Sequence, residues 1–180
     1  MLGFEFQPHL EGTTVALSAL TADRFEELQE TARNLSTWKD YPNPAVQTSG
    51  SLDAWFGMGV ERAKALLILD KASGRVIGTT RYYPVPNDAD GIGIGYTFLD
   101  AAFRRQGQTN SEIKALMFEH AFKSVSTVWF HVLPDNLRSQ AAVKKLGVTD
   151  HGVEVLTLTG KPLQYATFSL HKSRHVTGGA

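Results

Sequence analysis

The stretch Gly91–Phe122, GIGIGYTFLDAAFRRQGQTNSEIKALMFEHAF, decides how this chain folds. Its first six residues alternate glycine with isoleucine and then tyrosine, which predicts a strand with one apolar face. A turn with two arginines and a glycine follows, and the spacing of Ile113, Leu116 and Met117 predicts a helix directly after it. A helix N-terminus favours an anion, so this turn is either a phosphate site or a plain polar helix start.

The same reasoning extends along the chain. Seven strands are predicted at 13–20, 65–70, 75–85, 91–100, 126–136, 152–159 and 163–172. Four helices are predicted: one at 21–34, one at 51–65, one that ends the stretch 103–122 after its polar turn, and one at 138–148. Strands followed by two strand–helix units indicate the α/β (α+β) class, a mixed sheet with a ligand at the mouth of the central units.

Composition limits the classes of function. The chain has 180 residues, no cysteine, and 18 basic against 18 acidic side chains. Thiolate catalysis and cysteine-bound zinc are excluded, and no net charge draws the chain to nucleic acid or to a membrane. We see neither a signal peptide nor an apolar run of about 20 residues, and therefore expect a cytoplasmic protein.

The predicted elements belong to one domain, residues 1–172, followed by a frayed tail at 173–180. His171 and His175 are spaced four residues apart, but His175 lies in this frayed tail, so no metal site is predicted.

Two motifs carry a resemblance to a known family. The segments RRQGQTNSEIKALMFEHAF and NLRSQAAVKKLGV resemble the GNAT superfamily of acetyl-CoA-dependent N-acetyltransferases, and most of all its ribosomal-protein (Rim-type) branch. That branch has an N-x-E-x-K turn, matched by Asn110, Glu112 and Lys114. It also has N-x-x-S, matched by Asn136 and Ser139, and K-L-G, matched at 145–147. The close match covers 91–148.

The resemblance implies a mixed, mostly antiparallel central sheet of about seven strands. A V-shaped split between strands 4 and 5 and about four flanking helices complete this fold. Acetyl-CoA is the implied co-substrate, and its pantetheine arm would lie in the split. It would contact Thr97, Phe98 and Leu99 through their main chain. Gly93 and Gly95 indicate that another backbone or a ligand comes close to this strand. The pantetheine arm would explain these two glycines.

The family's pyrophosphate loop, Q/R-x-x-G-x-G/A, fits in two registers. Arg104, Gly107 and Thr109 give one register, and Arg105, Gln108 and Asn110 give the other, which aligns better with the N-x-E-x-K turn. In both registers one small residue is replaced, and backbone N–H groups are expected to hold the phosphates. The residues assigned to acetyl-CoA are Thr97, Phe98, Leu99, Arg104, Arg105, Gln106, Gly107, Gln108, Thr109, Asn110, Asn136 and Ser139.

In this family the amine attacks the thioester directly, so the enzyme positions two substrates and moves protons. The resemblance assigns Ser139 as the acid for the leaving thiolate and Asn136 as a partner of pantetheine or of a water. The alternative is that both residues only cap the helix that follows. His131 is the candidate base, against a packed strand histidine or a water as acceptor, whereas His120 is expected in the core.

Aromatic residues are expected around the acceptor amine. Trp38, Tyr41, Tyr82 and Tyr83 are assigned to substrate binding through cation–π contact, and ordinary packing is the alternative. The acceptor is a protein N-terminal amine or a small-molecule amine. Asp40, Asp88 and Asp90 suggest a cationic one.

Two other readings remain open. The imperfect loop is also compatible with a non-catalytic acyl-CoA-binding or sensory module. A nucleotide-binding α/β domain is the third reading, and the absence of a G-x-x-x-x-G-K-[ST] loop opposes it. The expected partners are acetyl-CoA and an amine, in a monomer or homodimer, with neither nucleic acid nor membrane.

Overall fold

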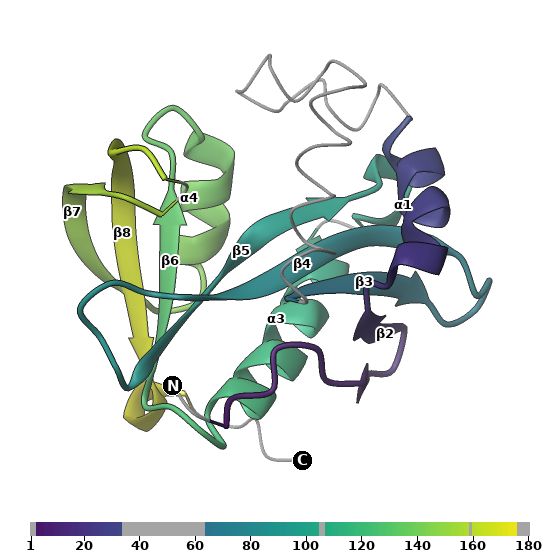
Figure 1. The fold of residues 1–180 in the computed structure, drawn as a ribbon, viewed down its shortest axis with the longest axis horizontal. Helices are drawn as coiled ribbons and strands as arrows, with labels where there is room; N and C mark the ends of the chain where they lie inside the picture. The colour runs from purple at the N-terminus through teal and green to yellow at the C-terminus, as the bar shows by residue number, and fades with distance from the viewer. Residues whose placement is uncertain (1–2, 34–63, 105–106, 159, 176–180) are drawn as a thin grey trace. The chain divides into compact units, whose positions relative to one another are not determined.

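The computed structural model describes residues 3–33, 64–104, 107–158 and 160–175 (Figure 1). The strands in chain order are β1 (Leu10–Glu11), β2 (Val15–Ala19), β3 (Ala65–Asp70), β4 (Val76–Pro84), β5 (Gly91–Leu99), β6 (Thr127–Val132), β7 (Thr149–Leu156) and β8 (Leu163–His171). The α-helices are α1 (Phe25–Ala32), α3 (Gln108–Ala121) and α4 (Leu137–Lys144), and the 3-10 turns are η1 (Ala22–Arg24), η4 (Ala101–Phe103) and η6 (Lys172–Arg174).

The strands form one open sheet in the order β1-β2-β3-β4-β5-β6-β8-β7. It is mixed and mostly antiparallel, which confirms the predicted fold class, with eight strands in place of seven. The additional strand, β1, has only two residues and is too short to show a periodic pattern. The predicted helix at 51–65 and the loop before it lie outside the described residues.

The parallel ladder between β5 and β6 joins Gly91–Gly93 to Thr127–Trp129. It therefore covers only the first three residues of a nine-residue β5. This short ladder agrees with the predicted split between these two strands.

The residues fall into two compact units. The α1 unit contains Glu5–Tyr82 and Tyr96–Met117, and the α4 unit contains Met1–Phe4, Tyr83–Gly95 and Phe118–Ala180. The strands β4 and β5 and the helix α3 each contribute residues to both units. Each unit is described below by itself.

The core of the α1 unit forms where α1 covers the sheet. Strand β3 is apolar on both faces, as expected for a strand that is covered on both sides. One cluster of buried side chains comprises Leu20, Leu28, Ala32, Ala65, Leu67, Val76 and Phe98. The buried Thr31 hydroxyl donates to the Val76 carbonyl at 2.7 Å, so a hydrogen bond also ties α1 to β4.

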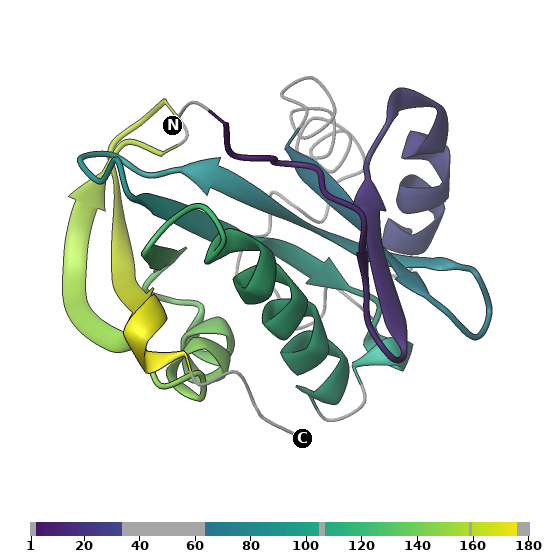
Figure 2. The same ribbon diagram turned by 90° about the horizontal axis from the view of Figure 1, so that it is seen from below.

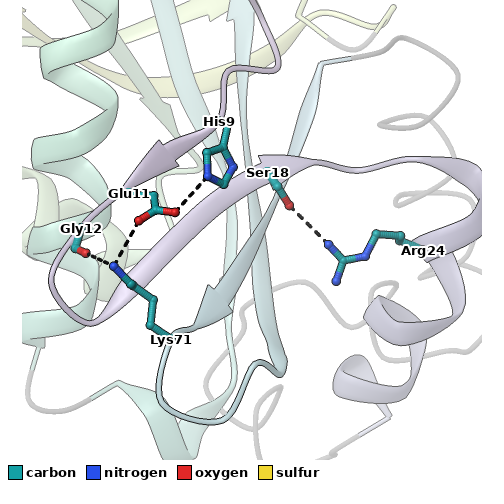
Figure 3. A network of polar contacts seen from close by, with 6 residues as sticks. All are labelled: His9, Glu11, Gly12, Ser18, Arg24 and Lys71. Atoms are coloured by element: carbon teal, nitrogen blue, oxygen red, sulfur yellow. Dashed lines mark hydrogen bonds and ion pairs between the residues drawn. The ribbon is translucent and has the colours of Figure 1, made fainter.

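The turn between β1 and β2 is held from two sides. On its exposed side, Lys71 donates to the Gly12 carbonyl at 2.9 Å and pairs with Glu11 at 3.3 Å, and Glu11 also contacts His9 (Figure 3). Such exposed ion pairs contribute little to stability. On its other side the turn lies beside α3 (Figure 2), where Glu112 binds its backbone, as described below.

In the α4 unit, β8 pairs antiparallel with both β6 and β7, and α4 lies beside β6 (Figure 1). Phe118 packs edge-on against Phe130, with ring centroids 6.0 Å apart. His175 contacts the rings of Phe118 and Phe122, so residues of the predicted tail pack against this unit up to that point. Among the described helices, none is long and apolar enough to span a membrane.

Candidate active site

The turn that leads into α3 is closed by its own hydrogen bonds, all within the α1 unit. The Asp100 carboxylate accepts from the Ala102 N–H at 3.0 Å, and the Thr109 hydroxyl donates to the Phe103 carbonyl at 2.6 Å. Gly107 donates its N–H to the Arg104 carbonyl and has a φ of +95°, in the left-handed region that favours glycine. Thr109 and Gly107 therefore shape the turn itself. Arg105 and Gln106 lie outside the described residues.

The first residues of α3 present backbone N–H groups that have no partner within the helix. Gln108 is exposed, Asn110 is partly buried, and the Ser111 hydroxyl donates to the Gly107 carbonyl at 3.1 Å. Arg104 turns its Nε toward the Leu99 carbonyl at 3.3 Å, which holds a guanidinium beside the turn. An anion at this end of the helix would meet N–H donors, the helix dipole and one positive charge.

Strand β5 contains one residue with a left-handed backbone (the kink) just before the segment that was assigned to pantetheine. Tyr96 has a φ of +52°, a left-handed conformation that is uncommon for a bulky residue and marks strain. The guanidinium of Arg81 lies 4.4 Å from the centre of its ring, which stabilises this conformation by a cation–π contact. No pattern in the sequence predicted this backbone conformation.

The side chains that follow the kink are buried or bonded to other residues of the protein. Phe98 is fully buried, Leu99 is nearly so, and the Thr97 hydroxyl contacts both Thr80 and Lys114 at 2.9 Å. The side chains of this segment are thus engaged within the protein, and the contact of its main chain with pantetheine stays a prediction.

The N-x-E-x-K motif has a structural meaning that the sequence did not show. The Glu112 carboxylate accepts from the Thr14 N–H at 2.8 Å and from its hydroxyl at 2.5 Å. Burial raises the pKa of Glu112, but these bonds and those from the Thr13 and Val15 N–H groups hold it below the usual value. A side chain at Gly12 would collide with this carboxylate. Glu112 thus fastens α3 to the β1–β2 turn.

In the α4 unit, Tyr83 and His131 form a pair. The Tyr83 hydroxyl lies 2.9 Å from His131 Nδ1, and the two partly buried rings lie 5.8 Å apart. The Tyr83 ring also fills the space that a Cβ on Gly93 would occupy and closely approaches Gly95. The glycines predicted the close approach of another backbone or of a ligand, and within the described residues the structure instead places an aromatic side chain there.

His131 is held in a largely apolar setting. Its ring stacks on Trp129 at 6.2 Å with 7° between the planes, and Tyr165 meets it edge-on. Burial lowers the pKa of His131 to about 4, while the negative charge of Glu154 acts in the opposite direction. The imidazole is consequently neutral near pH 7.

The sequence did not predict the contact between Trp129 and Asp88. The Trp129 indole N–H donates to the Asp88 carboxylate at 2.6 Å, which anchors the ring that supports His131. The alternation of β6 placed Trp129 and His131 on one face, and this was the only available signal. Asp88 also accepts from the Asp90 N–H, so its carboxylate is engaged with protein donors.

Asn136 caps α4, since its side-chain oxygen accepts from the Ser139 N–H at 3.0 Å. Asn136 therefore does cap the helix, and its amide NH₂ group remains a potential donor to a ligand. Ser139 is partly buried in the first turn of the helix. Among the described residues, no partner is seen for its hydroxyl.

Tyr82 differs from its predicted role. It is fully buried, and its hydroxyl donates to the Met117 carbonyl at 2.8 Å. Burial raises the pKa of its phenol. Tyr82 is therefore a core residue of the α1 unit, because its ring packs inward between β4 and α3.

The remaining predictions concern Trp38, Tyr41, His120 and a metal site. Trp38 and Tyr41, assigned to the amine, lie outside the described residues. His120 packs edge-on against Phe4 at 5.4 Å. In the described part of the chain, no three acidic or histidine side chains are gathered as a metal site would require. A hollow of about 360 Å³ in the α1 unit, lined by α1 and the β3–β4 turn, contains none of the predicted site residues.

The predicted residues thus fall into two groups. Thr97–Leu99, Arg104 and 107–110 belong to the α1 unit, whereas Tyr83, His131, Asn136 and Ser139 belong to the α4 unit. The first group offers backbone donors and a positive charge. The second offers a neutral imidazole, a phenol and an alcohol.

Comparison of the sequence with known protein families identifies one matching family. The sequence matches the family described as the acetyltransferase (GNAT) domain over residues 14–149. No curated protein matches it.

Solved structures are similar over nearly the whole chain. A GCN5-related N-acetyltransferase from Brucella melitensis has a TM-score of 0.80 at 18% identity, covering 96% of this chain and 82% of that one. The acetyltransferase (GNAT family) from Bacillus anthracis gives 0.69 at 12% identity, covering 92% and 99%. RimJ from Mycobacterium smegmatis, in complex with CoA-disulfide, gives 0.63 at 14% identity, covering 89% and 83%. At such identities these likenesses show the fold.

Proposed function

The chain belongs to the acetyltransferase (GNAT) domain family, and on this premise we propose that it transfers an acetyl group from acetyl-CoA to a primary amine. The observation that carries the proposal is the path from the kinked β5 through the closed turn to α3. It presents main chain at Tyr96–Leu99 and N–H donors at Gln108–Asn110 in one continuous segment.

The turn suits the phosphates of acetyl-CoA. Gly107 is the residue whose left-handed backbone needs glycine, which favours the register with Arg104, Gly107 and Thr109. In that register Arg104 supplies the charge and the first turn of α3 supplies the donors. Arg105 and Gln106 are included in the proposal on the resemblance alone.

The pantetheine arm is assigned to the main chain of Thr97–Leu99. The inward-facing side chains of Phe98 and Leu99 support this, because they fix the strand without taking part in binding. The complex of the Mycobacterium smegmatis protein RimJ with CoA-disulfide supports the same class of ligand for this fold.

The chemistry is a direct transfer. The neutral amine attacks the thioester carbon, the C–S bond breaks, and the departing thiolate takes a proton. We propose that the Ser139 hydroxyl gives this proton and regains one from water. Asn136 has its side-chain oxygen committed to the helix cap, so its NH₂ group is the part available to pantetheine or to a water.

The amine must also lose a proton. At a pKa of about 4, His131 is neutral and can accept a proton, but it is a weak base near pH 7. We therefore propose that the Tyr83–His131 pair orients the acceptor or a water and that water finally carries the proton. An α-amine, with a pKa near 7.8, needs less help than a lysine near 10.4, which favours an N-terminal or similarly weakly basic amine.

The test is calorimetric titration with acetyl-CoA, with desulfo-CoA and ADP as controls, followed by thiol release across peptides and small amines. Binding together with thiol release for one amine class supports the proposal and identifies the acceptor. Saturable binding without release to any amine supports the alternative of a non-catalytic acyl-CoA-binding module. ADP binding that acetyl-CoA cannot displace would instead support a nucleotide-binding domain.

A further inference from the structure

Lys114 is a buried amine within the α1 unit. It is 6% exposed and donates from Nζ to the Thr97 hydroxyl at 2.9 Å. Thr97 is in turn 2.9 Å from the Thr80 hydroxyl, which contacts the Met117 sulfur. Two hydroxyls therefore link the amine of α3 to β5 and β4, and one of them belongs to Thr97, the first residue of the segment assigned to pantetheine.

The charged groups on neighbouring elements are engaged elsewhere. On α3, Glu112 binds the β1–β2 turn. On β4, Arg81 faces the Tyr96 ring and the Tyr82 phenol binds a helix carbonyl.

The charged groups that follow β5 are likewise engaged. Asp100 accepts from the Ala102 N–H, and Arg104 reaches the Leu99 carbonyl. On β3, Asp70 binds the Ser73 hydroxyl at 2.6 Å. Within the described residues, Lys114 thus has hydroxyl neighbours and no carboxylate partner.

Burial alone lowers the pKa of Lys114 to about 7. Near neutral pH both forms of the amine are therefore accessible, and both retain an N–H donor for Thr97. The pKa of such a buried amine shifts strongly when a new charge comes near, because charges are only weakly screened in the protein interior.

We propose that Lys114 is a positioning residue that supports β5 through Thr97 and takes up a proton when acetyl-CoA binds. This inference rests on the proposed function, which brings a polyanionic ligand to the same strand and to the N-terminus of the same helix. The negative charges of the ligand stabilise the ammonium form. By linkage, a protonated Lys114 then stabilises the bound ligand to the same extent.

The experiment measures the dissociation constant for acetyl-CoA from about pH 6 to about pH 9, a range around the lowered pKa. The proteins are the wild type, Lys114→Met, Lys114→Arg and the control Lys123→Met, which removes an exposed lysine near the end of the same helix. Ionisation of the phosphates of acetyl-CoA is common to all four. Circular dichroism establishes that each variant is folded.

For the wild type, binding should weaken about threefold to tenfold across the range, beyond the change due to the ligand. Lys114→Met should bind more weakly than wild type at low pH and equally at high pH, where Lys114 is neutral. Lys114→Arg keeps its charge and should not show the added pH dependence, whereas Lys123→Met should follow the wild type. A merely structural role would instead give a constant offset between wild type and Lys114→Met at every pH.

Parallel curves for the wild type and Lys114→Met overturn the inference and leave the proposed function intact. If the wild type fails to bind acetyl-CoA, the proposed function fails and the inference falls with it. Should Lys114→Met not fold, proton uptake on binding is compared between wild type and Lys114→Arg by calorimetry in two buffers of different ionisation enthalpy. Equal uptake would then refute the inference.

Discussion

The hydroxyl of Tyr83 lies 2.9 Å from Nδ1 of His131, and the same tyrosine ring occupies the space above Gly93. One side chain thus connects the glycine-rich start of β5 with the histidine of β6. Because Trp129 also stacks on the imidazole, an aromatic ring and a hydrogen bond both constrain the orientation of His131.

Removing this hydrogen bond tests the role proposed for the pair. Tyr83→Phe should lower kcat about fivefold, as expected for the loss of about 1 kcal/mol of orientation, with little change in the dissociation constant for acetyl-CoA. Thiol release with the identified amine measures the effect. Tyr165→Phe, which changes another ring beside His131, is the control. A wild-type rate in Tyr83→Phe would remove the pair from the mechanism.

His131 should make the protein sensitive to acid. Its pKa is about 4 in the folded state against 6.5 for an ordinary histidine, so between these values the unfolded chain binds more protons. The unfolding free energy should therefore fall as the pH decreases through this window, by at most about 3 kcal/mol. Urea unfolding from about pH 7 to about pH 4 measures it.

In this experiment His131→Gln should lose part of the acid sensitivity, because the group that must be buried neutral is gone. His9→Gln, a change at an exposed position, should retain it. The same slope in wild type and His131→Gln would mean that carboxylates cause all of the acid destabilisation.

Gly93 should not tolerate a side chain. Gly93→Ala places a Cβ against the Tyr83 ring and should destabilise the protein by about 1–3 kcal/mol. In Gly95→Ala the nearest ring atom is 3.1 Å away, so a smaller loss is expected. Combining Gly93→Ala with Tyr83→Ala should show strong coupling in urea unfolding, and simple additivity would refute the contact.

The sequence predicted the elements better than the contacts between them. The alternation in β5 and the apolar spacing in α3 depend on local pattern, and both elements form as expected. Tyr96 shows where this reasoning ends, because nothing in the residue type signals a left-handed backbone. The ring of Tyr96 contacts the Arg81 guanidinium of a neighbouring strand, and no local pattern encodes such a contact.

The site residues show the same limit. Lys114 has the sequence appearance of a surface lysine, yet the helix turns it inward to Thr97. Tyr82 and Tyr83 are adjacent in sequence and were assigned together, but strand alternation directs the first into the core and the second to His131. In the sequence Asn136 fits a capping role and a ligand-binding role, and the bond from the Ser139 N–H establishes the capping role.

Glu112 should contribute to stability through the β1–β2 turn. Glu112→Ala leaves several backbone N–H groups without their acceptor and should cost about 1–3 kcal/mol. At about 2–4 °C per kcal/mol for a chain of this size, the melting temperature should fall measurably. The exposed Glu119→Ala on the same helix is the control and should change it little. Equal melting temperatures for the two variants would contradict this role.

Asn136 and Ser139 can be separated by what each substitution removes. Asn136→Ala deletes the cap acceptor and should lower the unfolding free energy by about 1 kcal/mol, whereas Asn136→Asp retains an acceptor and should preserve stability. Ser139→Ala keeps the capped N–H and removes only the hydroxyl. Its stability should stay within about 0.5 kcal/mol of wild type, while kcat falls about 100-fold if the hydroxyl protonates the thiolate.

Steady-state thiol release and urea unfolding on the same protein samples measure both quantities. Ser139→Ala removes only the hydroxyl, because the backbone N–H of residue 139 and its bond to Asn136 survive the substitution. A loss of kcat without a loss of stability therefore assigns the effect to the hydroxyl. Full turnover by Ser139→Ala would leave this residue with a place in the helix cap alone, and the thiolate would then take its proton from water.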